Sequence, residues 1–334
     1  MIPPTVRRPR RWRWVVAALV LLLMGAWFAA RVPDLPPAAL RAKYTTAASQ
    51  FITIEPGLSV HVRDEGPRDG LPIVLLHGSS SSLQTWEPWV KRLKGRYRVI
   101  TFDQAGHGLT GPHPRRDYGA AAFVRAVDEV ARAKGLGKFV LGGNSMGGWV
   151  AWNFAVAHPE RLAGLILVDA AGAPAQVEPR LPIGFRIART PVLRDLVGDI
   201  TPRSMVAKSI EQTVGDPRRI TPATIDRYWE LLRFPGNREA TIDRFSTPRQ
   251  LADPAALRRF EPPVLIVWGS ADKLIPVDAA GWFSRAFPHA RVAIFDGLGH
   301  VPMEEDPDRS IAPVLTFLDG LAPQTTAAAR TEAR

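Results

Sequence analysis

Three residues of the sequence are placed where they could act together in nucleophilic catalysis. Ser145 lies in the segment GGNSMGG, and glycines two positions to either side match G-x-S-x-G, the pattern of a serine exposed on a sharp strand-to-helix turn. A serine hydroxyl is a weak nucleophile until a histidine takes its proton, and that histidine needs an acid to hold its tautomer. His300 follows the last apolar run of the chain, and Asp272 follows the run before it. The order Ser145, Asp272, His300 therefore predicts a catalytic triad.

The acid of this triad has an alternative. Asp169 also ends an apolar run, LAGLILVD, so it could orient His300 in place of Asp272. A third aspartate, Asp103 in FDQAGHGLTG, is expected to be structural and to bond backbone amides of its own glycine-rich loop.

Two backbone amides are predicted to bind the oxyanion that forms during attack. Met146 directly follows the serine, and Ser79 belongs to the loop HGSSSS after another apolar run. Their N–H groups can point at the same carbonyl oxygen and donate to the charge that develops there. Four further residues are expected to shape the pocket: His77, Gly78, His107 and Trp149.

The elements that must position these residues alternate along the chain. A hairpin is expected at 51–66, where apolar and polar residues alternate around a Pro-Gly turn. Short apolar runs typical of buried parallel strands follow at 72–78, 97–103, 138–144, 162–169, 262–269 and 290–297. Helical patterns lie between them, at 83–94, 117–134, 147–158, 276–287 and 305–318. This alternation predicts an α/β fold with a mostly parallel, doubly wound sheet.

One segment interrupts the alternation. Residues 174–249 contain short helical patterns, many prolines and arginines, and no convincing strand. We predict that they form a helical cap over the strand ends, where open α/β sheets bind ligands. The cap would divide the core domain into residues 51–173 and residues 250–322, and the tail 323–334 is expected to be disordered.

The N-terminus has the pattern of a membrane anchor. Five arginines precede the uncharged run Trp14 to Ala30, and no A-x-A cleavage site ends that run. We expect residues 1–31 to be an uncleaved single-pass anchor, with a cleaved secretion signal as the alternative. The arginines should keep the N-terminus in the cytoplasm and place the catalytic domain on the periplasmic or outer side. Residues 32–50, which begin VPDLPPAAL, are expected to be a stiff linker.

Composition and motifs exclude several other classes of protein. The net charge of +11 arises largely at the N-terminus, basic residues elsewhere are mixed with acids, and no nucleic-acid motif is present, so we expect no nucleic-acid binding. Cysteine is absent, which excludes disulfides and a thiolate nucleophile. The sequence contains neither H-E-x-x-H nor a G-x-G-x-x-G with a downstream acid, so we expect no metal and no cofactor.

Five segments stand in the order of the α/β-hydrolase fold family, which the sequence resembles over residues 51–320: HGSSSSLQTW, FDQAGHGLTG, GNSMGG, WGSADKLIP and GLGHVPMEEDP. It is similar in detail to the bacterial lipase and esterase branch with an N-terminal membrane segment. The resemblance implies that Ser145 is acylated, that His300 serves as base and then as acid, and that Asp272 orients it. The serine argues against haloalkane dehalogenase and epoxide hydrolase chemistry, which uses an aspartate there. His107 is a departure, because close relatives often carry an aromatic residue at this position.

We therefore expect a serine hydrolase, an esterase or lipase, that cleaves a neutral, fairly apolar small-molecule ester beside the membrane through an acyl-enzyme. Two alternatives would use the same triad. One is a carbon–carbon bond hydrolase of ring-cleavage products, as in the meta-cleavage-product hydrolases, and the other is a haloperoxidase-like hydrolase. A non-catalytic binding scaffold is a third alternative, which the intact triad disfavours.

Overall fold

A computed structural model describes residues 11–174, 181–190 and 198–321. An eight-stranded sheet lies at its centre, in the order β1-β2-β4-β3-β5-β6-β7-β8. The strands are β1 (Ser49–Glu55), β2 (Leu58–Glu65), β3 (Pro72–Leu76), β4 (Arg98–Phe102), β5 (Phe139–Asn144), β6 (Leu162–Val168), β7 (Val264–Gly269) and β8 (Ala290–Phe295). β2 pairs antiparallel with both β1 and β4, and β3 to β8 are parallel. The predicted mostly parallel sheet is confirmed, and each predicted apolar run contains one of β3 to β8.

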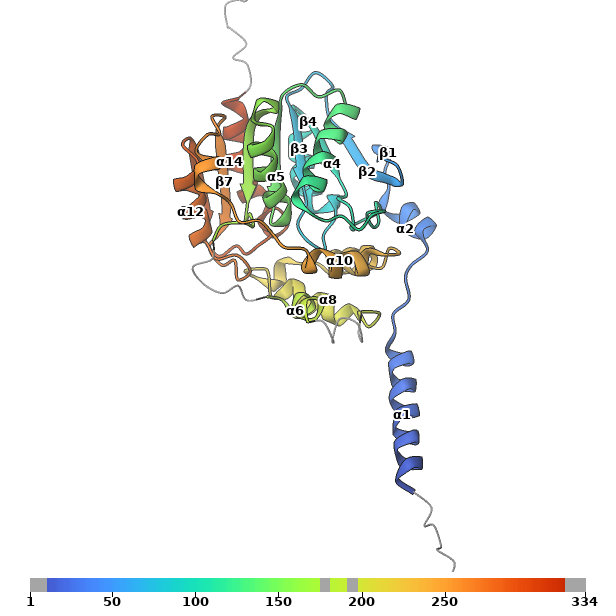
Figure 1. Ribbon diagram of the computed structural model, residues 1–334. Coiled ribbons are helices and arrows are strands. Elements are labelled where there is room, and N and C mark those ends of the chain that lie inside the picture. Colours follow the sequence, from blue (N-terminus) through green and yellow to red (C-terminus); the bar gives the residue numbers. More distant parts are fainter. Residues whose placement is uncertain (1–10, 175–180, 191–197, 322–334) are drawn as a thin grey trace, which may run out of the picture.

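Helices cover both faces of this sheet. Those of the core are α3 (Glu87–Leu93), α4 (Ala120–Ala133), α5 (Met146–Ala157), α11 (Pro254–Leu257), α12 (Asp278–Ala286), α13 (Pro302–Glu305) and α14 (Pro307–Asp319), with short 3-10 turns at Leu83–Trp86, Pro159–Arg161 and Pro217–Arg219. One hydrophobic core joins α4, α5 and α12 to one face, and a second joins α3 and α14 to the other (Figure 1). The sequence of β5 is apolar because both of its faces are buried. Leu141 belongs to the first core and Val140 to the second.

Among the described residues, four further helices lie between β6 and β7 in the sequence and form the cap. They are α6 (Ile183–Arg189), α8 (Arg203–Glu211), α9 (Pro222–Leu232) and α10 (Asn237–Ser246). Figure 1 shows α6, α8 and α10 together along one end of the sheet, below its strands. Parts of the predicted cap, residues 175–180 and 191–197, lie outside the described residues, as do the N-terminal arginine cluster up to residue 10 and the tail 323–334.

A buried ion pair joins the cap to the core. Arg227 on α9 donates from Nη2 to Oε2 of Glu304 on α13 at 2.6 Å, and the Tyr228 hydroxyl donates to Oε1 at 2.9 Å. The side chains of Arg227 and Glu304 are only 14% and 5% exposed. Because few water molecules reach this pair, the cap depends on the carboxylate to neutralise the guanidinium.

Glu304→Gln should destabilise the protein by about 3 kcal/mol, because it leaves the Arg227 charge buried without a counter-ion. Thermal unfolding of the detergent-solubilised chain measures the effect. Asp226→Asn is the matched control, since it breaks a cap pair with Arg203 whose side chains are 39% and 40% exposed, and it should leave the melting temperature nearly unchanged. Equal effects of the two substitutions would show that the Arg227–Glu304 pair does not hold the cap.

The described part of the N-terminal region contains two helices, α1 (Arg11–Ala30) and α2 (Pro37–Tyr44). Within the described residues one helix is long and apolar enough to cross a membrane, Trp12–Ala30, with a mean hydropathy of 1.9. A signal sequence has the same properties, so this helix is compatible with either role. Figure 1 shows α1 extending away from the rest of the molecule on the side of the cap.

The structure differs from the plain linker expected at residues 32–50. This segment contains α2 and the start of β1, and Leu40 is buried in a small core with Leu231 and Phe234 of the cap and Leu109 of the core domain. The backbone N–H of Leu35 also donates to the carbonyl of Arg233 at 2.9 Å. The apolar side chain of Leu40 explains the difference, because a groove between the cap and the core domain buries it.

Candidate active site

The turn between β5 and α5 holds Ser145 in an unusual backbone conformation. Its φ of 55° and ψ of −115° lie where side chains are rarely tolerated, so the turn stores strain. The neighbours have to be glycine: a Cβ on Gly143 would lie 2.2 Å from the carbonyl oxygen of Gly147, and a Cβ on Gly147 would lie 2.2 Å from that of Leu76. The backbone N–H of Ser145 donates to the carbonyl of Val168 at 3.0 Å. This turn places Ser145 at the end of β5, at the edge of a cavity.

The structure brings His300 and Asp272 together. Nδ1 of His300 lies 2.7 Å from Oδ2 of Asp272, and both side chains are buried. The other oxygen, Oδ1, accepts hydrogen bonds from the backbone N–H groups of Leu274 and Ile275 at 2.8 and 3.0 Å. With Nδ1–H donating to the carboxylate, Nε2 is left as the basic nitrogen. That atom has no hydrogen-bond partner among the described residues, and His300 borders the same cavity as Ser145.

The alternative acid, Asp169, lies beside this pair but is not bonded to His300. It ends β6, is fully buried, and accepts a hydrogen bond from the backbone N–H of Gly269 at 2.9 Å. Burial, together with the charge of Asp272, raises the pKa of Asp169 well above its usual range. Of the two neighbouring carboxyl groups, Asp169 is therefore the one whose surroundings favour the protonated form.

Among the described residues, one group of possible metal ligands lies close together. It consists of Asp169, Asp272 and His300, whose ligand atoms lie within 4.8 Å of one another. The 2.7 Å separation of Asp272 and His300 is that of a direct hydrogen bond. A neutral Asp169 would add no negative charge to a cation site. The arrangement therefore suits an oriented histidine better than a bound metal.

Asp169→Asn tests this assignment. The side-chain amide has the shape of a protonated carboxyl group and can still accept from the Gly269 N–H, so kcat should stay within about threefold of the wild type. The stability should change in a pH-dependent way. In the wild type, Asp169 loses its proton near the ordinary pKa of 3.8 when the chain is unfolded, but keeps it to a higher pH when the chain is folded. The stability of the wild type therefore falls as pH rises from about 3.8 toward the raised pKa of the folded state.

Melting temperatures of the two proteins measured at about pH 4.5 and about pH 8 would reveal this loss in the wild type and less of it in the variant. A large loss of kcat in Asp169→Asn at unchanged stability would instead make Asp169 the acid that His300 needs.

The loop after β3 brings Ser79 against the serine turn. A Cβ on Gly78 would lie 2.9 Å from Oδ1 of Asn144 and 3.1 Å from Cβ of Ser145, so only glycine allows the loop to pass this closely. Met146 is the first residue of α5, and the first N–H groups of a helix have no acceptor within it. Ser79 borders the same cavity as Ser145, and Met146 directly follows it at the start of α5. The role of their N–H groups as oxyanion donors stays a prediction.

His77 and His107 lie behind this loop, and neither is among the residues that border the two cavities described below. His77 accepts from the backbone N–H of Gln104 at 3.0 Å and bonds the Gly78 carbonyl at 2.8 Å, which braces the loop. The two histidine rings meet edge to face with centroids 4.8 Å apart. Burial lowers the pKa of both, further for His107, where the charge of Arg244 adds to it. These histidines are neutral supports, while Gly78 and Trp149 border the cavities as expected.

Asp103 has the structural environment that the sequence suggests. Its Oδ1 accepts from the N–H of Leu83 at 2.8 Å, and its Oδ2 accepts from the N–H of Leu109 at 2.9 Å and lies 2.8 Å from Nδ1 of His61. The His61 contact carries no sequence signal, because His61 lies in β2 while Asp103 follows β4, far along the chain.

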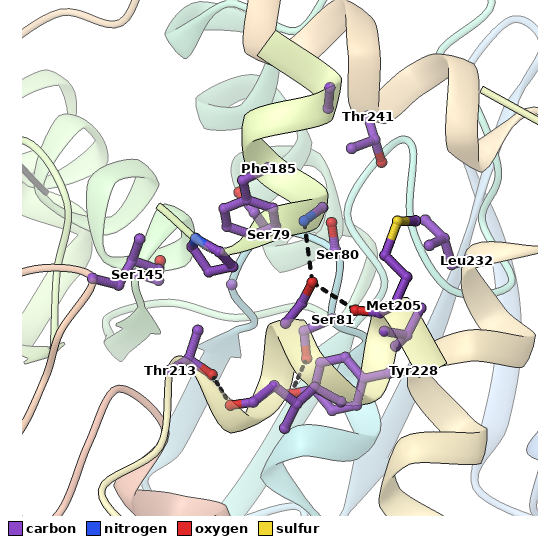
Figure 2. A pocket seen from close by; sticks show the side chains of 18 of the residues that line it. Ser79, Ser80, Ser81, Ser145, Phe185, Met205, Thr213, Tyr228, Leu232 and Thr241 are labelled. Atoms are coloured by element: carbon purple, nitrogen blue, oxygen red, sulfur yellow. Dashed lines mark hydrogen bonds between the residues drawn. The ribbon is translucent and has the colours of Figure 1, made fainter. Parts of the chain in front are cut away.

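Two cavities meet at Ser145 and Ser79. The first lies between the core and the cap, and its lining is rich in apolar side chains such as Phe185, Ile187, Met205, Ile210, Ile220 and Leu232. Figure 2 shows Ser145 in this cavity with Ser79, Ser80 and Ser81 of the loop after β3, and with Met205 and Leu232 from the cap. The second cavity runs from Ser145 past α10 toward α12 and is bordered by several charged residues.

Sequence reasoning gave no role to several residues around these cavities. They are Tyr228, Arg244, Arg249 and Glu304. Glu304 lies in GLGHVPMEEDP, four residues after His300, so its neighbourhood was visible in the sequence. The cap residues follow no motif, because their positions depend on how the cap folds over the core.

Comparison with known proteins supports this reading of the fold. A family model described as alpha/beta hydrolase fold matches residues 72–307. An uncharacterised protein of Mycobacterium tuberculosis is 30% identical over 270 residues, which are 76% of this chain and 77% of that protein. Lipase 3 of Moraxella sp. is 27% identical over 75% of this chain and 78% of its own. A 2-hydroxy-6-oxononadienedioate/2-hydroxy-6-oxononatrienedioate hydrolase of Dechloromonas aromatica is 28% identical over 81% and 96%.

Solved structures of the same architecture cover nearly the whole chain. The crystal structure of a membrane phospholipase A superimposes with a TM-score of 0.72 at 24% identity, over 92% of this chain and 98% of that one. A thermophilic esterase from Thermogutta terrifontis gives a TM-score of 0.69 at 26% identity, over 82% and 99%. Of these two structures the phospholipase covers more of this chain, and at 24% identity it shows the fold alone.

Proposed function

The chain belongs to the α/β-hydrolase fold family, and from this premise we propose that it is a serine hydrolase that cleaves carboxylic esters. The observation that carries the proposal is the state of His300. Its Nδ1 lies 2.7 Å from Oδ2 of Asp272. Its Nε2 is buried and has no hydrogen-bond partner among the described residues, and the histidine borders the same cavity as Ser145. A histidine held this way is ready to take a proton from a serine.

The proposed reaction has two halves. Oγ of Ser145 attacks the ester carbonyl and gives its proton to Nε2 of His300, and the N–H groups of Ser79 and Met146 stabilise the oxyanion. His300 then gives the proton to the leaving alcohol, which departs and leaves an acyl group on Ser145. Water attacks this acyl-enzyme with His300 as base, and the carboxylic acid leaves with Ser145 restored. Asp272 keeps Nδ1 protonated throughout and stabilises the imidazolium.

The apolar lining of the first cavity supports an ester with a hydrocarbon chain. Each buried methylene contributes about 0.8 kcal/mol, which corresponds to about fourfold in kcat/KM. With p-nitrophenyl esters from acetate upward, kcat/KM of the detergent-solubilised chain should therefore rise until the cavity is filled. The chain length at the maximum separates an esterase for short esters from a lipase. A flat profile would rule out an apolar acyl site.

Cleavage of a carbon–carbon bond is the second candidate, because a relative of similar identity is named as a hydrolase of a ring-cleavage product. The same residues could carry it. Turnover of a 2-hydroxy-6-oxohexa-2,4-dienoate, followed by loss of its absorbance, would favour this reaction if the p-nitrophenyl esters are not cleaved.

We also infer that α1 anchors the enzyme in a membrane with the catalytic domain on the periplasmic or outer side. The arginine cluster before the helix supports this orientation. The residues after α1 bind the cap, since Arg238 donates to the Val32 carbonyl at 2.9 Å and to Asp34 at 2.6 Å. The full chain should stay in the membrane pellet after an alkaline carbonate wash. A mature protein that begins near residue 32 would show a cleaved signal instead.

A further inference from the structure

The second cavity differs from the first in the charge of its lining. Among the described residues, three arginines border it: Arg189 from the end of α6, Arg249 from the segment after α10, and Arg285 from α12. Asp278 is the acidic residue among the described residues that border it. Within the described part of the chain, none of the three guanidinium groups forms an ion pair with a carboxylate. The cavity is therefore a positively charged space that opens directly onto Ser145.

All three arginines lie on the solvent-exposed rim of this cavity. Partial desolvation at the cavity wall, and then the charge of Arg189, lower the pKa of Arg249. Arg249 is held in place by the ring of Phe245, whose centroid lies 5.6 Å from its guanidinium carbon. Like charges held near each other cost free energy unless an anion lies between them.

A fourth arginine extends the positive charge to the serine turn. Arg244 on α10 is only 2% exposed, and its Nη1 lies 3.3 Å from Oγ of Ser79 and 3.5 Å from Sδ of Met146. Arg249 approaches the same Ser79 hydroxyl from the other cavity wall, with Nη2 at 3.4 Å.

The guanidinium of Arg244 is incompletely satisfied. Its Nη2 donates to Thr241 at 2.9 Å, its Nε has no partner among the described residues, and burial lowers its pKa to about 9. A buried cation without a carboxylate is costly to keep, and a bound anion would repay part of that cost.

We propose that the second cavity binds an anionic group of the substrate, a phosphate or a carboxylate. The hydrocarbon chain of the same substrate would occupy the first cavity, so that the scissile ester lies between the two. The proposal rests on the function proposed above and names its substrate class: esters of anionic amphiphiles. Guanidinium groups suit this role because their planar N–H donors match the oxygens of phosphates and carboxylates. Ser145 and Ser79, which border both cavities, would receive the ester between the two parts.

The test compares substrates that differ in the anion alone. The first pair is 1-lauroylglycerol 3-phosphate and 1-lauroylglycerol, and the second is O-lauroyl-lactate and its methyl ester. With the full chain in non-ionic detergent, kcat/KM for the anionic member of at least one pair should be about 10- to 100-fold higher. A preference in the first pair identifies a phosphate, and a preference in the second identifies a carboxylate. No preference in either pair overturns the proposal.

Variants locate the site. In the double variant Arg189→Met, Arg249→Met, the preference should fall to about one-tenth or less of the wild-type ratio, mainly through KM of the anionic ester. Arg186→Met is the matched control, because Arg186 lies on the same helix as Arg189 but borders neither cavity, and it should keep the ratio. An unchanged ratio in the double variant would place the anion elsewhere and overturn the proposal.

A further measurement needs no variant. The wild-type preference should shrink as NaCl is raised from about 20 mM to about 500 mM, because salt screens the attraction, while hydrolysis of the neutral ester changes little. A ratio of kcat/KM values that does not change with the NaCl concentration would contradict binding of the anion by arginines. Failure of the proposed function can be distinguished from failure of the anion site. If the protein is not a serine esterase, neither the neutral lauroyl esters nor the p-nitrophenyl esters show turnover that depends on Ser145.

Discussion

Ser145→Ala should lower kcat for ester hydrolysis by about 10⁴- to 10⁶-fold, to the level left by binding and the oxyanion donors alone. The substitution removes the atom that attacks the carbonyl. His300 and Asp272 would remain bonded at Nδ1 but would have no hydroxyl to deprotonate. Rates for a p-nitrophenyl ester measure the effect.

The fold of this variant should be preserved, which separates loss of chemistry from loss of structure. The hydroxyl of Ser145 makes no hydrogen bond to another described residue, so its removal leaves no buried group without a partner. The φ of 55° is as strained for alanine as for serine. Melting temperatures should therefore agree closely.

A fluorophosphonate probe gives an independent readout. It should label the wild type and a Ser284→Ala control, whose serine lies on α12 but borders neither cavity, but not Ser145→Ala. Retained turnover in well-folded Ser145→Ala would remove the proposed mechanism altogether.

Asp272→Asn should lower kcat by about 10⁴-fold, a loss of the size seen when the acid of a serine-protease triad is replaced by its amide. The hydrogen bonds around Asp272 explain why. Oδ1 accepts from the N–H groups of Leu274 and Ile275, and the oxygen of the new amide has to stay there. Its NH₂ group would then face His300 and donate to Nδ1. The imidazole would carry its proton on Nε2, so the nitrogen that faces the cavity could no longer act as a base.

The contrast with Asp169→Asn makes this prediction specific. Both aspartates are buried, and their oxygens lie within 4.8 Å of each other and of His300. Only Asp272 shares a hydrogen bond with the imidazole, and only Asp169 is held protonated by burial. We therefore expect the two amide substitutions to differ by about a thousandfold or more in kcat. Similar losses in both variants would mean that the two carboxyl groups act as one unit.

The sequence was sufficient for the features around the catalytic serine, which depend on residues close together in the chain. The run KFVLGGN followed by SMGG specifies a buried strand, a glycine-flanked turn and a helix, because each step is a local demand on backbone conformation or burial. The apolar runs of β3 to β8 predicted the parallel sheet for the same reason. Parallel strands also bring their carboxyl ends to one edge, so the residues that follow β5, β7 and β8 were expected to meet.

Tertiary structure alone decided the contacts between segments that are far apart and share no motif. Asp169 and Asp272 both follow strands of the same sheet, and no spacing rule tells which one reaches His300. The protonation of Asp169 depends on burial against Asp272, which the chain acquires only when β6 and β7 pair.

The cap shows this limit most clearly. The convergence of Arg244 and Arg249 on Ser79 joins residues more than 160 positions apart, at separations of 165 and 170. The Arg227–Glu304 pair and the docking of Leu40 against the cap are of the same kind. Helical patterns predict that a cap exists, because they reflect local periodicity. Which of its side chains enter the cavities depends on how the cap packs on the core, and that packing exists only in the folded chain.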